Sequence, residues 1–150
     1  IDTPILIESK HTSILTTDVK IYIQESKRLE YYEIIQMNVS KDGKYDFLIS
    51  STDEVDVSLY NNYLDRDNDT INLLLRLSIG CTIDQTKFTR NLQLNETYYL
   101  LITTSDLNTT LSFSVLLIGP SHILFSEMCK LFCPMRMRPY VENFFSIVYI

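Results

Sequence analysis

The chain has 150 residues, with 13 basic and 19 acidic side chains and a formal net charge of −6, and this length predicts one domain with one core. Its 10 tyrosines and 7 phenylalanines, beside only 3 glycines and 4 prolines, favour strands over helices. The acidic balance argues against nucleic acid as a partner, because phosphate binding needs a basic face. No apolar run approaches the roughly 20 residues of a membrane helix, so we expect no membrane span within the chain.

Period-two alternation of apolar residues predicts a series of strands along the first 118 residues. The first three predicted strands are VKIYIQ from residue 19, EIIQMNVS from residue 33 and KYDFLIS from residue 44. Asp42 and Gly43 separate the last two strands and are typical of a tight hairpin, since both tolerate positive φ. Three more predicted strands are EVDVSLY from residue 54, YYLLITT from residue 98 and TLSFSVLLI from residue 110. This spacing predicts an all-β, antiparallel β-sandwich over residues 1–120.

The last 30 residues follow a different pattern. Leu124, Met128 and Leu131 have helical spacing up to Pro134, and a second apolar set has the same spacing after Pro139. Two short helices and an appended strand both agree with this pattern. We therefore expect residues 121–150 to form a short C-terminal extension, helical or strand-like, or a linker.

Four Asn-x-Ser/Thr sequences indicate N-glycosylation and an extracellular or cell-surface location. The acceptors are Asn38, Asn68, Asn95 and Asn108. The alternative is a cytosolic structural fragment in which these sequences occur by chance. Because the chain begins with isoleucine, we expect it to be a piece or a processed product of a larger protein.

The three cysteines leave the redox state open. Cys81, Cys129 and Cys133 allow one disulfide with one thiol left over, in any of three pairings, or three free thiols. A zinc site built on the last two is disfavoured, because only His122 lies near them in the sequence.

An ordered series of segments between about residues 28 and 120 resembles a known extracellular family. The segments are YYEIIQMNVSKDGKYDFLIS, VSLYNNYLD, NLLL, LNETYYLLITT and LSFSVLLIGP. In this order and spacing they resemble the pre-peptidase C-terminal domain. The resemblance implies a jelly-roll-like sandwich that accompanies other domains in secreted or surface proteins, and it implies no active site. Some relatives bind calcium, polysaccharide or matrix protein.

Three aspartates at every second position, Asp65, Asp67 and Asp69, suggest a calcium loop. The helix-loop-helix calcium site is excluded, because its sixth and twelfth positions would be Thr70 and Arg76 in place of glycine and glutamate. Family relatives also carry further acidic residues where this chain reads LRLS at residues 75–78. A solvated acidic loop is therefore favoured over a looser calcium site, and no other cofactor is expected.

A second candidate set combines aromatic rings with amides at a predicted turn. Tyr60 and Tyr63 flank Asn61 and Asn62, a combination suited to stacking on a sugar ring while the amides bond its hydroxyls. The alternative is that these tyrosines are ordinary half-buried strand residues.

Catalysis is not expected. The chain has two histidines, and it has no Gly-x-Ser-x-Gly elbow and no phosphate-cradling glycine loop. The sequence therefore predicts a non-catalytic accessory, adhesion or ligand-binding module of a larger secreted or surface protein. Its expected partners are other domains of the same polypeptide and a glycan or matrix protein. The alternative function is a polysaccharide-binding or targeting module attached to a secreted hydrolase.

Overall fold

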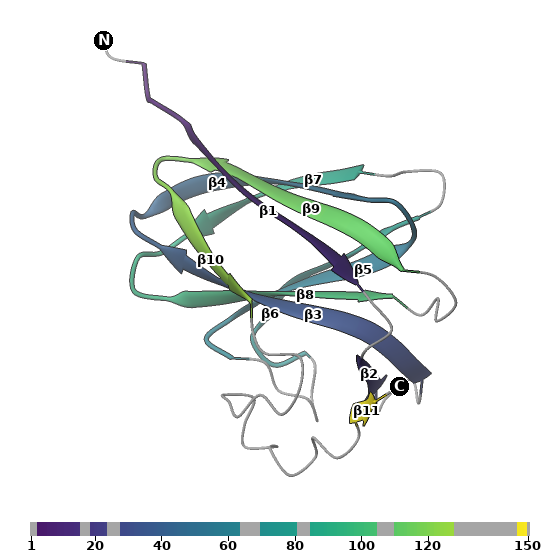
Figure 1. Ribbon diagram of the computed structural model, residues 1–150. Helices are drawn as coiled ribbons and strands as arrows, with labels where there is room; N and C mark the ends of the chain where they lie inside the picture. The colour runs from purple at the N-terminus through teal and green to yellow at the C-terminus, as the bar shows by residue number, and fades with distance from the viewer. Residues whose placement is uncertain are drawn as a thin grey trace.

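Two antiparallel β-sheets face each other in the computed structural model (Figure 1), which describes residues 3–15, 19–23, 28–63, 70–80, 85–104, 110–127 and 147–149. The strands are β1 (Ile7–Leu15), β2 (Val19–Ile23), β3 (Arg28–Val39), β4 (Gly43–Ser51), β5 (Val55–Asn61), β6 (Leu73–Ile79), β7 (Gln85–Leu92), β8 (Thr97–Thr104), β9 (Leu111–Gly119), β10 (Ile123–Glu127) and β11 (Ile147–Tyr149). The predicted fold class, an all-β antiparallel sandwich, is confirmed. The described ranges contain no helix with the length and apolar character to cross a membrane.

The first sheet has the strand order β1-β9-β4-β7, and the second has the order β11-β2-β3-β8-β5-β6. The long strand β3 pairs with β8 along one side. On its other side it pairs with β2 near its beginning and with β10 near its end. Both β1 and β10 therefore lie at the same open edge of the sandwich, one from each sheet, and β10 descends along that edge in Figure 1.

Alternating side chains fill the space between the sheets. On β4, Tyr45, Phe47 and Ile49 are fully buried, and on β9 the inward positions include Phe113 and Val115. The rings of Phe47 and Phe88 stack with their centroids 4.5 Å apart. The period-two pattern of the sequence thus becomes one continuous apolar core.

The predicted hairpin at Asp42 and Gly43 is wrong, because β3 and β4 belong to different sheets. The chain turns here from the second sheet into the first, so β4 pairs with β7 and β9 instead. Gly43 has a φ of 156°, and a Cβ built on it would lie 2.6 Å from Cγ of Pro120. Glycine is therefore favoured at this position by the close approach of Pro120 and by the positive φ, and not by a hairpin.

The described part of the C-terminal extension is strand. Ile123 is 5% exposed and Leu124 is 67% exposed, which is the alternation of a strand with one buried face. The helical alternative is therefore wrong for Ile123–Glu127, and the appended strand is observed there. Residues 128–146 lie outside the described residues.

Candidate metal centre

The inward face of β1 carries a row of polar side chains, whereas the inward face of the neighbouring strand β9 is apolar. Ser9, His11 and Ser13 occupy alternate positions, opposite Leu117, Val115 and Phe113 of β9. Since β1 is the edge strand of its sheet, this polar row lines the edge of the sandwich. The Ser9 hydroxyl accepts a buried 2.9 Å hydrogen bond from the backbone N–H of Ile123, which ties β1 directly to β10.

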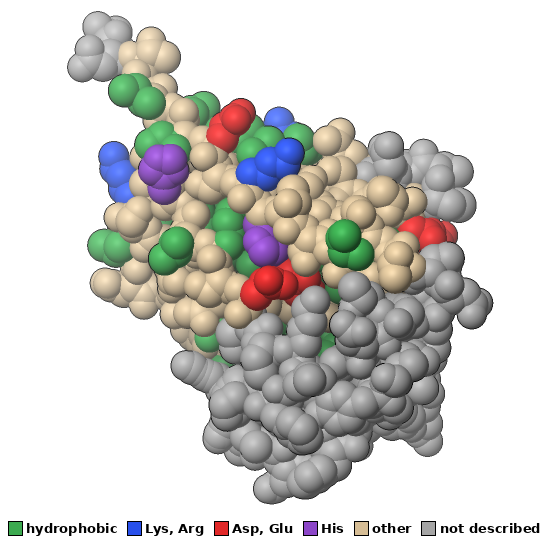
Figure 2. All heavy atoms as spheres, viewed as in Figure 1, with side chains coloured by type: hydrophobic (Ala, Val, Ile, Leu, Met, Phe, Trp, Pro, Cys, Tyr) green, Lys and Arg blue, Asp and Glu red, His purple; other side chains and the backbone are tan. Residues whose placement is uncertain are grey.

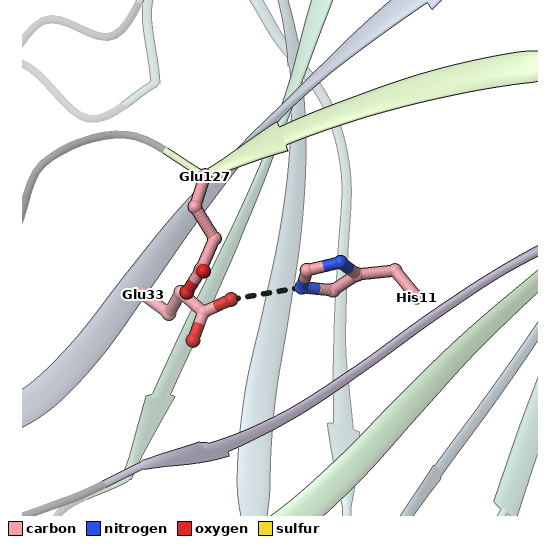
Figure 3. Close-up of side chains that lie close together, drawn as sticks. All are labelled: His11, Glu33 and Glu127. Atoms are coloured by element: carbon pink, nitrogen blue, oxygen red, sulfur yellow. Dashed lines mark hydrogen bonds and ion pairs between the residues drawn. The ribbon is translucent and has the colours of Figure 1, made fainter.

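Facing this row, Glu33 of β3 is fully buried. It lies on the same face of β3 as Ile35 and Met37, two residues and four residues further on, which are core residues. A carboxylate buried among apolar residues is costly unless it is hydrogen-bonded. Two hydrogen-bond partners of Glu33 come from the opposite sheet. Nε2 of His11 lies 3.0 Å from Oε2 (Figure 3), and the Ser13 hydroxyl donates to Oε1 over 2.5 Å.

A third group, Glu127, reaches the same point from the end of β10. Glu127 lies opposite Ile35 in the β10–β3 register, so Glu33 is its diagonal neighbour on the same face, within reach of a long side chain. Figure 3 shows the two carboxylates beside each other and the His11 ring facing them. One possible ligand atom from each of these three residues lies within 4.8 Å of the other two.

Aromatic rings from both sheets hold the imidazole. Phe113 of β9 and Phe125 of β10 contact the His11 ring, with centroid distances of 6.3 and 5.6 Å. The His11 side chain stays 16% exposed, and Figure 2 shows a histidine directly above acidic side chains on the surface that is viewed. The cluster is therefore built into the sandwich edge and is reachable from solvent.

The arrangement is not a nucleophilic triad. In such a triad the serine hydroxyl bonds to the imidazole and the acid bonds to the other ring nitrogen. Here Ser13 and His11 both bond to Glu33, so the Ser13 hydroxyl is not placed for activation by the ring. One imidazole and two carboxylates converging on one point form, instead, a donor set that suits a divalent metal ion.

The structure buries part of the predicted ligand-binding set and exposes the rest. Tyr60 is 1% exposed and its hydroxyl accepts a 3.4 Å hydrogen bond from Arg76, so the prediction that Tyr60 stacks on a ligand is wrong. Asn61 is half-buried, and its side-chain amide donates to Glu96. Asn62 and Tyr63 are exposed. Only the last two present their side chains to solvent.

The other predicted sites fall partly outside the described residues. Asn95 is exposed in the turn between β7 and β8, and Asn38 is half-buried on β3. The remaining predicted residues lie outside the described ranges: Asp65, Asp67, Asp69, Asn68, Asn108, Cys81, Cys129 and Cys133.

Reasoning from the sequence missed His11, Glu33 and Glu127 as a group. Two signals were present: Ser9, His11 and Ser13 alternate with Lys10 and Thr12 as in a strand, and Glu33 lies on the same period-two face as Ile35, Met37 and Val39. A charged residue on a core-facing position demands a partner. The sequence does not say that residue 127 meets it, because that depends on strand pairing.

Comparisons with known proteins assign the chain to no family. No protein-family model and no curated protein sequence matches the chain. Among solved structures, the crystal structure of the Yersinia pseudotuberculosis-derived mitogen (YPM) is similar, with 13% identity and a TM-score of 0.43, over 77% of this chain and 86% of that chain.

Proposed function

We propose that the chain is a non-catalytic recognition module of a larger extracellular or cell-surface protein, and that it binds a glycan with the loops at one end of the sandwich. The observation that carries this proposal is a braced turn region that presents an exposed aromatic ring and an exposed amide, Tyr63 and Asn62, beside an exposed glycosylation acceptor, Asn95.

Hydrogen bonds between two chain segments brace this end. The Asn61 amide donates to Oε2 of Glu96 over 3.2 Å, and the Tyr98 hydroxyl lies 3.1 Å from the same oxygen. The backbone N–H of Asn62 donates to the Thr97 carbonyl over 2.7 Å. The start of the β5–β6 connection is thus fixed against the turn before β8, and preorganised loops lose less entropy when they bind.

The exposed pair has the chemistry of a sugar site. Asn62 has a φ of 71°, in the left-handed region that asparagine tolerates, and the N–H of Tyr63 donates to the Asn61 carbonyl over 2.9 Å. Tyr63 is 37% exposed. A tyrosine ring offers an apolar face to a sugar ring, and a neighbouring amide can bond its hydroxyls.

Two further features support the extracellular part of the proposal. The Asn95 acceptor lies in an exposed turn, where a glycan can be attached without disturbing the core. The ordered segments between about residues 28 and 120 resemble a family of secreted accessory modules. A module attached to a secreted hydrolase would use the same surface to bind polysaccharide.

Binding to a glycan array and to insoluble chitin, cellulose and xylan tests the proposal. We expect Tyr63→Ala to weaken binding about twofold to tenfold, since specific aromatic contacts contribute about 0.5–1.5 kcal/mol beyond area burial, and Tyr63→Phe to retain it. Leu124→Ala, which removes an exposed apolar side chain on β10, is the control and should bind as the unmodified chain does. The proposal would be rejected if the chain bound none of these glycans, or if Tyr63→Ala bound as well as the unmodified chain.

A further inference from the structure

We propose that His11, Glu33 and Glu127 bind one divalent transition-metal ion of the zinc type, which joins the two sheets at the edge between β1 and β10. This inference rests on the cluster alone and is independent of the proposed glycan surface.

The donor atoms select the class of ion. Calcium and magnesium take oxygen ligands, whereas imidazole suits zinc, copper, iron and nickel. One imidazole nitrogen with two carboxylate oxygens is a mixed set of the kind that zinc accepts, and three protein ligands leave a fourth position for water. The site is thus different in chemistry from the calcium loop that Asp65, Asp67 and Asp69 suggest.

The spacing of the donors fits such an ion with small adjustments. Zinc binds nitrogen and oxygen at about 2.0–2.2 Å in tetrahedral geometry, so neighbouring ligand atoms are about 3.3 Å apart. Nε2 of His11 and Oε2 of Glu33 are 3.0 Å apart. All three ligand atoms lie within 4.8 Å of one another, so a shift of the exposed Glu127 carboxylate by about 1–2 Å brings the three atoms to this spacing.

Electrostatics favour a cation at this point. Two carboxylates held close together repel each other unless a proton or a cation lies between them. Glu33 is fully buried, and the β10–β3 register places the backbone of the exposed Glu127 beside it. A divalent ion would offset both charges and leave the imidazole neutral, the form in which it binds metal.

The surroundings already orient the ligands. Ser13 donates to the second oxygen of Glu33, which is the type of outer hydrogen bond that positions a metal-binding carboxylate. Phe113 and Phe125 contact the His11 ring from the two sheets. The ion would bind an arrangement that the folded chain provides and that the unfolded chain lacks.

The consequence is a cross-link between sheets. His11 belongs to β1 of the first sheet, while the two glutamates belong to β3 and β10 of the second. An ion that binds the folded state and not the unfolded state must raise the melting temperature in proportion to the logarithm of its excess over Kd. Zinc should therefore stabilise the chain, and lowering the pH should weaken its binding, because protons compete for the same ligands.

Titration of the full chain with zinc chloride, followed by calorimetry and by thermal melting, tests the site. Glu127→Gln is the decisive variant, because this exposed residue can lose its charge without disturbing the core. We expect its zinc affinity to fall at least about tenfold, since the loss of even an outer-shell partner costs about 10–100-fold. His11→Ala should behave alike. His122→Ala removes the other, exposed histidine and is the matched control, with Asp67→Ala as the control for the acidic loop.

The outcomes distinguish zinc binding at this site from zinc binding at other residues. Loss of affinity in Glu127→Gln and His11→Ala, with both controls unchanged, supports the proposal. Three results would overturn it: no zinc-dependent rise in melting temperature, full zinc affinity in Glu127→Gln, or an equal response to calcium and zinc. If His11→Ala does not fold, Glu127→Gln still decides the question.

Discussion

The Ser13 hydroxyl on β1 donates a hydrogen bond to Oε1 of Glu33 on β3, from one sheet to the other, over 2.5 Å. Removing this donor in Ser13→Ala leaves a buried carboxylate oxygen without it. We expect the free energy of unfolding to fall by about 1–3 kcal/mol, measured by urea denaturation. Ser126→Ala, at an exposed position of β10, is the control, and an equal effect of the two changes would contradict the role of Ser13.

We expect substitution by alanine to destabilise the fold at Gly119 and to have little effect at Gly80. A Cβ on Gly119 would lie 2.1 Å from Cδ1 of Tyr45, whereas a Cβ on Gly80 would meet none of the described residues within 4 Å. The Tyr45 ring is fully buried, and its hydroxyl lies 2.8 Å from the Lys41 carbonyl oxygen, to which it donates, so the ring has little room to move. We expect Gly119→Ala to lower the free energy of unfolding by about 1–3 kcal/mol.

Gly80→Ala should leave the midpoint of urea denaturation nearly unchanged. A midpoint shift for Gly80→Ala as large as for Gly119→Ala would show that the close approach to Tyr45 is not the cause.

Burial raises the pKa of Tyr98 above its ordinary value of 10.0, and the Glu96 carboxylate acts in the same direction, while the hydrogen bond from the Gln93 amide opposes it. Above pH 10 the unfolded chain releases this proton and the folded chain still holds it. Folding stability must therefore fall as the pH rises from 10 through the folded-state pKa.

Urea denaturation between pH 9 and pH 11 measures this loss. Tyr98→Phe removes the ionisation, so its stability should fall less steeply over the same range. Identical slopes for the two proteins would contradict the shift, even if Tyr98→Phe is less stable at every pH because the Gln93 N–H loses its 2.9 Å acceptor.

Asn95 should carry a glycan when the chain is made in the secretory pathway of a eukaryotic cell. Its turn is exposed and the sequence NET fits the acceptor rule. On gel electrophoresis, Asn95→Gln should increase the mobility of the chain by one step, and endoglycosidase treatment of the unmodified chain should have the same effect. Asn91→Gln, an exposed asparagine outside any acceptor sequence, should not, and a chain insensitive to the enzyme would contradict the extracellular proposal.

The fold class was predictable because alternation of apolar residues reports directly which side chains face the core. Tyr45, Phe47 and Ile49 illustrate this, since all three are fully buried as their spacing indicates. The pairing of strands was harder to predict from the sequence. Asp42 and Gly43 carry a strong local hairpin signal, yet the turn connects two sheets, because burial on two opposed faces outweighed the local preference.

The candidate metal site could not be predicted from the sequence, for a related reason. A buried carboxylate on β3 could be inferred from the place of Glu33 in its alternating strand, but its partners lie 22 residues before it and 94 residues after it in the chain. These groups come together only because β10 pairs with β3 and β1 pairs with β9. Likewise, Tyr60 and Tyr63 look alike in the sequence, and only strand β5 decides that Tyr60 is inside.

Anomalous X-ray diffraction at the zinc absorption edge, from crystals of the chain grown with zinc, tests the central claim most directly. The account predicts an anomalous peak at about 2.0–2.2 Å from Nε2 of His11 and from a carboxylate oxygen of Glu33 and of Glu127. A map with no peak between these three side chains, or with zinc bound only at other residues, would contradict it.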